Sequence, residues 1–244
     1  MILDKIHAQL DFHQRNLKET TRQEWIEPPF SVLDTKGRAW QGRREIWYRL
    51  GIHSELGRGE KYSGYSNFGD WIAEKGWTKE GSFVGQETKL KTSIFDPVLC
   101  ELMYRWFCPD LGSVLDPFAG GSVRGIVSGA CFRPYLGIDL NEDRILSNRE
   151  QANTIFEKEK PKWIHGDSEK ILNTIDQKFD FLFSCPPYFD LEVYTDHEDD
   201  LSTMDEENFV NKYHSIIKKS VDKLNENRFA VFVVGEVRNS KGFY

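Results

Sequence analysis

Short apolar runs alternate with segments of helical periodicity throughout residues 91–244, and this alternation constrains the fold more than any other feature of the chain. Strands are expected at 113–116, 134–139, 163–167, 179–184 and 229–234. Strands that alternate with helices usually pair in parallel and carry helices on both faces of the sheet. The pattern therefore predicts an α/β fold with a doubly wound, mostly parallel sheet of the Rossmann-like type.

The helix boundaries carry local signals of their own. Asp96-Pro97 combines an N-cap residue with a proline at the first helical position. Asn141 is a second N-cap candidate, and Thr203 precedes Glu206 by the spacing of a capping box. These signals predict helices that begin near residues 97, 142 and 204. A further helix is expected at 121–130.

Residues 1–90 differ in composition from the rest of the chain. We expect an N-terminal helix followed by an aromatic and basic extension in this part, and the sheet domain at 91–244. Five of the seven tryptophans lie between residues 25 and 85, interleaved with arginines. Such residues stack on bases or hold phosphates, but they also pack small irregular domains, and packing is the interpretation that we favour. Residues 36–61 carry an excess of four positive charges. Phosphate contacts are therefore predicted at Arg38, Arg43 and Arg44.

The last expected strand is apolar on both faces, so it requires neighbours. An uncovered edge strand would be an aggregation hazard. We expect that the protein continues beyond residue 244, or that N-terminal residues or a second subunit cover this strand. A dimer is one of these alternatives.

The composition limits where the protein acts. The longest apolar run, at 229–234, is far too short to span a bilayer, and residues 1–20 lack the continuous apolar core of a secretory signal. We therefore expect a cytoplasmic protein without a membrane partner. The four cysteines show neither Cys-x-x-Cys pairing nor the histidine spacing of zinc sites, so reduced thiols and no metal are expected. The net charge of −7 argues against indiscriminate coating of nucleic acid.

Residues with chemical potential follow the expected strands. Phe118-Ala-Gly-Gly-Ser122 forms a glycine turn between a strand and a helix, where backbone can approach a ligand closely. Asp139 ends the second strand and can hold ribose hydroxyls, while the turn at Asp167 can reach an adenine amine. The fourth strand ends in Ser184-Cys-Pro-Pro-Tyr188, whose prolines lack N–H donors and present carbonyl oxygens. Carboxyl ends of parallel strands share one edge, so a cofactor site and a substrate site are expected side by side.

The segments Asp116-Pro-Phe-Ala-Gly-Gly121 and Cys185-Pro-Pro-Tyr188 resemble the cofactor and catalytic motifs of the amino DNA methyltransferases, which modify adenine N6 or cytosine N4. With Pro28–Asp34 and Leu191–Tyr194 the chain is also similar to putative DNA methyltransferases of phages and prophages. The resemblance implies S-adenosylmethionine as cofactor and a flipped base of double-stranded DNA as substrate. A bacterial or phage-infected cell would be the setting.

The resemblance also assigns roles within the site. Phe118, Gly120 and Gly121 would hold the methionine part of the cofactor, Asp139 its ribose and Asp167 its adenine. The other side would be closed by Phe95 and Asp96. The target amine would donate to Cys185 and to the Pro186 carbonyl, with Pro187 completing the rigid turn and Tyr188 stacking on the flipped base.

Cys185 departs from the family, in which Asp, Asn or Ser usually stands before the diproline. A thiol is a poor acceptor, and Ser184 or an acid outside the motif is a candidate to compensate. Three alternatives stay open: attack on cytosine C6 by Cys185, an RNA or protein substrate, and a catalytically silent cofactor- or DNA-binding module.

The acidic segment 190–207 is interpreted as a solvated connection with an acidic helix start. A loop that orders on substrate binding is the alternative interpretation.

Overall fold

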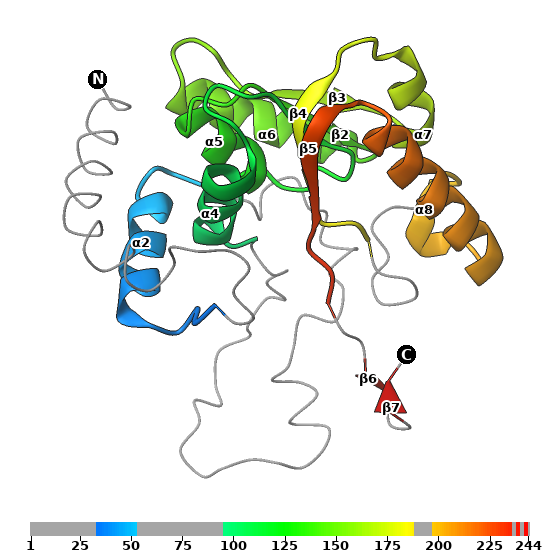
Figure 1. The fold of residues 1–244 in the computed structure, drawn as a ribbon, viewed down its shortest axis with the longest axis horizontal. Coiled ribbons are helices and arrows are strands. Elements are labelled where there is room, and N and C mark those ends of the chain that lie inside the picture. The colour runs from blue at the N-terminus through cyan, green and yellow to red at the C-terminus, as the bar shows by residue number, and fades with distance from the viewer. Residues whose placement is uncertain (1–32, 53–94, 188–196, 236–237, 240–241, 244) are drawn as a thin grey trace.

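The computed structural model describes residues 33–52, 95–187, 197–235, 238–239 and 242–243. Its centre is a five-stranded sheet in the order β3-β2-β1-β4-β5, and every neighbouring pair is parallel (Figure 1). The strands are β1 (Val114–Asp116), β2 (Tyr135–Asp139), β3 (Lys162–His165), β4 (Phe179–Ser184) and β5 (Leu224–Phe232). The parallel α/β sheet predicted from the alternating pattern is confirmed.

Helices cover both faces of this sheet (Figure 1). They are α2 (Arg38–Tyr48), α4 (Pro97–Phe107), α5 (Val123–Ala130), α6 (Glu142–Ile155), α7 (Ser168–Ile171) and α8 (Glu206–Val221), with 3-10 turns η2 (Leu172–Thr174) and η3 (Leu201–Thr203). One core cluster joins α2, α4, α5 and α6 to the sheet, and a second joins α7 and α8 to the opposite face. A short hairpin of β6 (Arg238–Asn239) and β7 (Gly242–Phe243) follows β5.

The strand order determines where the segments predicted to bind ligands lie. From β1 the chain runs outward through β2 to β3, then returns to pair β4 with the other side of β1. Loops that leave β1 and β4 at their carboxyl ends therefore depart toward opposite faces and open a crevice. The expected glycine turn follows β1, and the Cys-Pro-Pro segment follows β4, so both flank this crevice.

Two predicted helix starts are confirmed and one is wrong. The Asp96 side chain accepts from the N–H groups of Val98 and Leu99, and Asn141 accepts from Arg144 N. The expected capping box at Thr203 does not form, because Asp205 is the N-cap of α8 and accepts from Asn208 N. Aspartate is the stronger N-cap, and Thr203 instead closes η3.

The described part of the N-terminal segment packs directly on the sheet domain. Trp40 and Trp47 of α2 are fully buried and belong to the same cluster as α4. Glu101 of α4 accepts a bidentate pair from Arg43 and a bond of 2.8 Å from Trp47 Nε1. Burial opposes the charge of Glu101, but Arg43 outweighs it and lowers the pKa of that carboxyl. Within residues 33–52 the aromatic residues thus serve packing, whereas the rest of the aromatic and basic stretch lies outside the described residues.

Strand β5 forms one edge of the sheet. It begins five residues earlier than the apolar run suggests and pairs only with β4 among the described residues. Phe229 is 55% exposed on this strand. The expected cover of this edge has no counterpart in the described ranges and remains an expectation. No helix in those ranges combines the length and apolarity needed to cross a membrane.

Candidate active site

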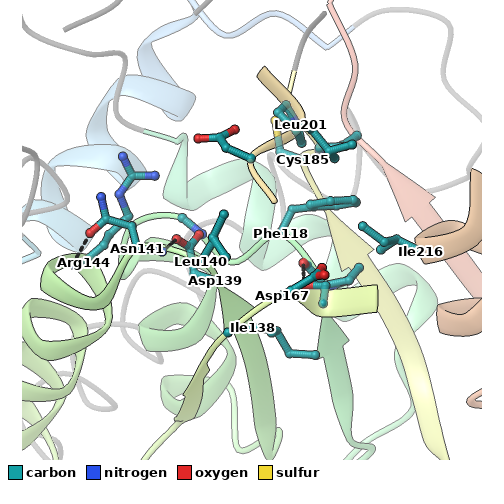
Figure 2. A pocket seen from close by; sticks show the side chains of 18 of the residues that line it. Phe118, Ile138, Asp139, Leu140, Asn141, Arg144, Asp167, Cys185, Leu201 and Ile216 are labelled. Carbon is teal, nitrogen blue, oxygen red and sulfur yellow. Dashed lines mark hydrogen bonds between the residues drawn. The ribbon is translucent and has the colours of Figure 1, made fainter. Parts of the chain in front are cut away.

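A pocket of about 250 Å³ opens at the carboxyl edge of the sheet (Figure 2). The turns after β1, β2, β3 and β4 all contribute to its wall, and so do η3 and α8. Figure 2 shows Asn141 and Arg144 well separated from Cys185 and Leu201, so the pocket is elongated along the edge. Most of the residues predicted from the sequence lie here: Phe95, Phe118, Gly120, Gly121, Asp139, Asp167, Cys185, Pro186 and Pro187.

The Asp139 side chain, at the end of β2, holds the glycine turn in place. Gly120 has a φ of +54°, a conformation that a side chain would strain, and its N–H donates to Asp139 Oδ2 at 2.7 Å. The other carboxylate oxygen of Asp139 accepts from Asn141 N at 2.9 Å. Each carboxylate oxygen has two lone pairs, so Asp139 keeps acceptor capacity for a ligand. An acceptor in this position suits a pair of ribose hydroxyls.

Asp116 has a different place from the one expected. Its side chain is fully buried, is not part of the pocket wall, and accepts from Arg124 Nε at 2.6 Å and from Tyr135 OH at 2.7 Å. The Ser184 hydroxyl also donates to Asp116, at 2.5 Å, and accepts from Phe118 N. Both residues therefore tie the end of β4 to the turn after β1. Neither side chain lines the pocket, in contrast to the predicted cofactor role of Asp116 and the catalytic role of Ser184.

Arg124 is the cation at the centre of this arrangement, and sequence reasoning missed it. Its Nη2 donates to the carbonyls of Phe118 and Ala119 at 2.5 and 3.0 Å, and its guanidinium lies 4.7 Å from the Phe95 ring centroid. Burial disfavours its charge, but Asp116 outweighs burial and raises the pKa of Arg124. Two carbonyl groups of the glycine turn thus accept hydrogen bonds from a permanently charged guanidinium. An arginine eight residues after the strand gives no sequence signal of this role.

Asp96 also serves the framework. Its carboxylate caps α4, accepts from Trp40 Nε1 at 3.0 Å and pairs with Arg44 at 2.6 Å. It is not among the residues that line the pocket. The neighbouring Phe95 does line it, so only half of the predicted closing pair faces the ligand space.

The basic residues predicted to contact DNA separate into two kinds. Arg43 is 5% exposed and bound to Glu101, so it cannot reach a phosphate without breaking a buried ion pair. That prediction was wrong, because a guanidinium on the inner face of α2 is needed to neutralise Glu101. Arg44 is partly exposed and already paired with Asp96, whereas Arg38 is exposed at the start of α2.

An acid–base cluster lines the pocket between the turn after β3 and α8. Lys212 Nζ of α8 donates to Asp167 Oδ2 at 3.1 Å and to Asp199 Oδ1 at 3.0 Å. Lys170 donates to the second oxygen of Asp199 at 2.6 Å, and the two lysines lower the pKa of Asp199 to about 2. Asp199 and its neighbour Asp200 line the pocket, and Asp200 is buried. Residues 199 and 200 are therefore part of the pocket wall rather than a solvated connection, whereas Glu206 and Glu207 form an exposed acidic start of α8, as expected.

The Cys-Pro-Pro segment forms the pocket wall at the carboxyl end of β4. Cys185, Pro186 and Pro187 all line the pocket, near the Phe118 ring, which stacks on Tyr213 of α8 at a centroid distance of 6.2 Å. Cys185 is partly exposed. Tyr188 lies outside the described residues, so its stacking role stays a prediction.

The remaining thiols are poor nucleophiles. Burial raises the pKa of Cys100 well above its ordinary value, that of Cys131 to about 12 and that of Cys108 to about 11. Thiolate is the reactive form, so these groups stay inert near neutral pH. Among the four cysteines, Cys185 is the one that a solute in the pocket can reach.

No family model matches the sequence, and no curated protein matches it. Among solved structures, TrmN from Thermus thermophilus shares 19% identity at a TM-score of 0.45, over 57% of this chain and 38% of that one. A SAM-dependent methyltransferase from Agrobacterium tumefaciens shares 15% at 0.46, over 59% and 46%. The SAH-bound Podospora anserina methyltransferase shares 13% at 0.41, over 58% and 53%. This chain spans less than two thirds of each, and we assign function from the pocket itself.

Proposed function

We propose that this protein is an S-adenosylmethionine-dependent methyltransferase that methylates an exocyclic amine, adenine N6 or cytosine N4, of a flipped base in DNA. The observation that carries the proposal is the pocket at the strand crossover, which joins the Gly120 turn, Asp139, Asp167 and the Cys185-Pro-Pro segment. DNA as the substrate rests on the resemblance of the glycine turn and the diproline segment to amino DNA methyltransferases.

The groups that line the pocket fit the cofactor along its whole length. A nucleoside needs acceptors for its ribose hydroxyls and its adenine amine, and Asp139 and Asp167 supply carboxylates at the ends of neighbouring strands β2 and β3. The methionine part needs close backbone approach, which the Gly120 turn after β1 allows. The reactive end then lies toward β4, where Cys185 begins the diproline segment.

The chain's own residues bind and orient the reactants. Asp139 would hold the ribose, Asp167 the adenine, and Phe118 would pack beside the reactive end. When bound, S-adenosylmethionine would supply an electrophilic methyl group and leave as S-adenosylhomocysteine, and the methylated amine nitrogen would lose its proton to water. The Cys185 side chain and the Pro186 carbonyl would accept hydrogen bonds from that amine and aim its lone pair. Such orientation lowers the barrier by fixing reactants that would otherwise tumble.

Calorimetric titration with S-adenosylhomocysteine tests the cofactor half of the proposal. We expect micromolar binding that Asp139→Asn weakens by at least about tenfold, since hydrogen bonds to a charged acceptor are each worth about 1.5–3 kcal/mol. Asp143→Asn, an exposed carboxylate in the first turn of α6, is the matched control and should bind as the wild type does. Equal affinities for the two variants would refute the role of Asp139.

Transfer of a labelled methyl group tests the substrate half. Protein and labelled cofactor are incubated with double-stranded DNA, RNA or unrelated protein, and digested DNA is analysed by mass spectrometry. We expect N6-methyladenine or N4-methylcytosine. Label in RNA or protein alone would contradict the DNA proposal.

Cys185→Ser separates two chemistries at the same residue. A hydroxyl accepts hydrogen bonds better than a thiol, so amine methylation should persist or increase in this variant. A cysteine that attacks cytosine C6 would lose its function on the same change. C5-methylcytosine as the product, or a covalent adduct with fluorocytosine-containing DNA, would overturn the proposed chemistry.

A further inference from the structure

The pocket contains an ammonium group for which the proposed reaction has no role. Lys212 projects from α8 into the pocket wall, and its side chain is only 11% exposed. Its partner Asp167 is 6% exposed at the side chain. Removing an ammonium from water is costly unless its hydrogen bonds are replaced, so a lysine held here demands an explanation.

The bonds of Lys212 leave it with capacity for a ligand. An ammonium has three N–H donors, and the described residues take two of them, Asp167 Oδ2 at 3.1 Å and Asp199 Oδ1 at 3.0 Å. Asp167 accepts from Glu169 N through its other oxygen, and a carboxylate has about four acceptor sites in total. The wall of the pocket therefore presents a donor directly beside an acceptor.

That pairing matches one edge of adenine. The 6-amino group is a donor, and each ring nitrogen that flanks it, N1 or N7, is an acceptor. A carboxylate alone reads the amine. A carboxylate beside an ammonium can accept from the amine while the ammonium donates to one flanking nitrogen. The pair therefore distinguishes adenine from rings that lack either group.

We propose that Lys212 is a specificity-determining residue of the nucleoside subsite: it donates to the ring nitrogen beside the 6-amino group, while Asp167 accepts from the amine. The inference rests on the proposed function, because it assumes an adenine at this end of the pocket. It adds to that function a residue from α8, 45 positions away from Asp167 in the sequence.

The second bond of Lys212 gives the subsite its geometry. Asp199 is itself held by Lys170 at 2.6 Å, so Lys212 is clamped between two carboxylates rather than free to rotate along its stem. The formal charges of Lys170, Lys212, Asp167 and Asp199 sum to zero, so the cluster carries no net charge at the pocket wall. A purely structural role, in which Lys212 merely fastens residue 199 to α8, is the competing explanation.

Deaza analogues of the bound product separate the two explanations. The wild type is titrated with S-adenosylhomocysteine and with its 1-deaza and 7-deaza analogues, in which a C–H replaces one ring nitrogen. We expect one analogue, which identifies the nitrogen, to bind about 10- to 100-fold more weakly, the effect of a hydrogen bond to a charged donor. Because this comparison uses wild-type protein, it needs no variant to fold.

Lys212→Met should then bind S-adenosylhomocysteine and the discriminated analogue within about twofold of each other. Lys219→Met is the matched control, because Lys219 lies two turns further along α8, donates to the Glu169 carbonyl at 3.0 Å and is not part of the pocket wall. That variant should keep the wild-type discrimination.

The outcomes distinguish the two proposals. If the wild type does not bind S-adenosylhomocysteine, the proposed function fails and the inference fails with it. If the wild type binds all three compounds equally, or Lys212→Met keeps the discrimination, the cofactor assignment stands and the role of Lys212 is refuted.

Discussion

Replacing Asp116 with asparagine should destabilise this protein more than the loss of any surface carboxylate. Asp116 is fully buried, and Arg124, its partner at 2.6 Å, has a side chain that is only 6% exposed. Asparagine leaves the guanidinium charged and uncompensated, and its amide nitrogen replaces one of the two oxygens, so N–H groups would meet either Tyr135 OH, which donates to Oδ2, or Ser184 OH, which donates to Oδ1. Breaking a buried ion pair from one side costs about 3–5 kcal/mol.

The predicted cost is large enough to measure by thermal unfolding. For a domain of this size about 1 kcal/mol corresponds to about 2–4 °C, so Asp116→Asn should lower Tm by about 6–20 °C. Asp110→Asn is the control, because Asp110 pairs with the buried Arg133 at 3.2 Å while its own side chain is fully exposed. Water screens such a pair, and no measurable shift is expected.

A double replacement tests whether the uncompensated charge of Arg124 causes the loss of stability. If the uncompensated charge of Arg124 causes the loss, then Arg124→Met in the Asp116→Asn background should recover part of the stability. A Tm for Asp116→Asn within 2 °C of that for Asp110→Asn would refute the account. So would a double variant whose loss equals the sum of the two single losses.

Three further changes follow from the same structure. Gly125→Ala should cost about 1–3 kcal/mol in urea unfolding, because its Cβ would lie 2.3 Å from Trp163 Cζ2, whereas Gly42→Ala, with no atom within 4 Å, should be neutral or stabilising. Iodoacetamide at pH 8 should modify Cys185 first, and S-adenosylhomocysteine should slow that reaction; mass spectrometry that finds equal labelling with and without the ligand would place the thiol outside the site. Two lysines lower the Asp199 pKa to about 2, so its stabilisation is complete above about pH 4 and lost as pH falls toward 2; Asp199→Asn should be less stable by about 0.5–1 kcal/mol at pH 6 and equal to the wild type near pH 2, and a difference independent of pH would contradict this.

Local features of the site could be predicted from the sequence. The turn at Gly120 and the acid at Asp139 come directly after apolar runs, so their neighbours along the chain already identify them as strand ends. The caps at Asp96 and Asn141 depend on bonds that span two or three residues. The N-cap of α8 was not predicted correctly, because Asp205 rather than Thr203 caps this helix.

The roles of individual charges could not be predicted in this way. Arg43 stands in a basic stretch that suggests a phosphate contact, yet it is buried against Glu101, 58 positions later. Ser184 looks like a catalytic neighbour of the diproline, but its hydroxyl is bonded to Asp116, 68 positions earlier. Whether a charge faces solvent, a ligand or a buried partner depends on which distant segment packs against it.

The sequence by itself determined the alternating strands and helices, their assembly into a parallel, doubly wound sheet, and the polar turns that follow β1 to β4. These properties depend on hydrophobic periodicity and on short-range hydrogen bonds, and both are written into consecutive residues. Only the tertiary structure decided that Arg124 supports the glycine turn and that Lys212 meets Asp167 and Asp199. Contacts between groups far apart in the chain arise when packing buries both, and no local pattern records them.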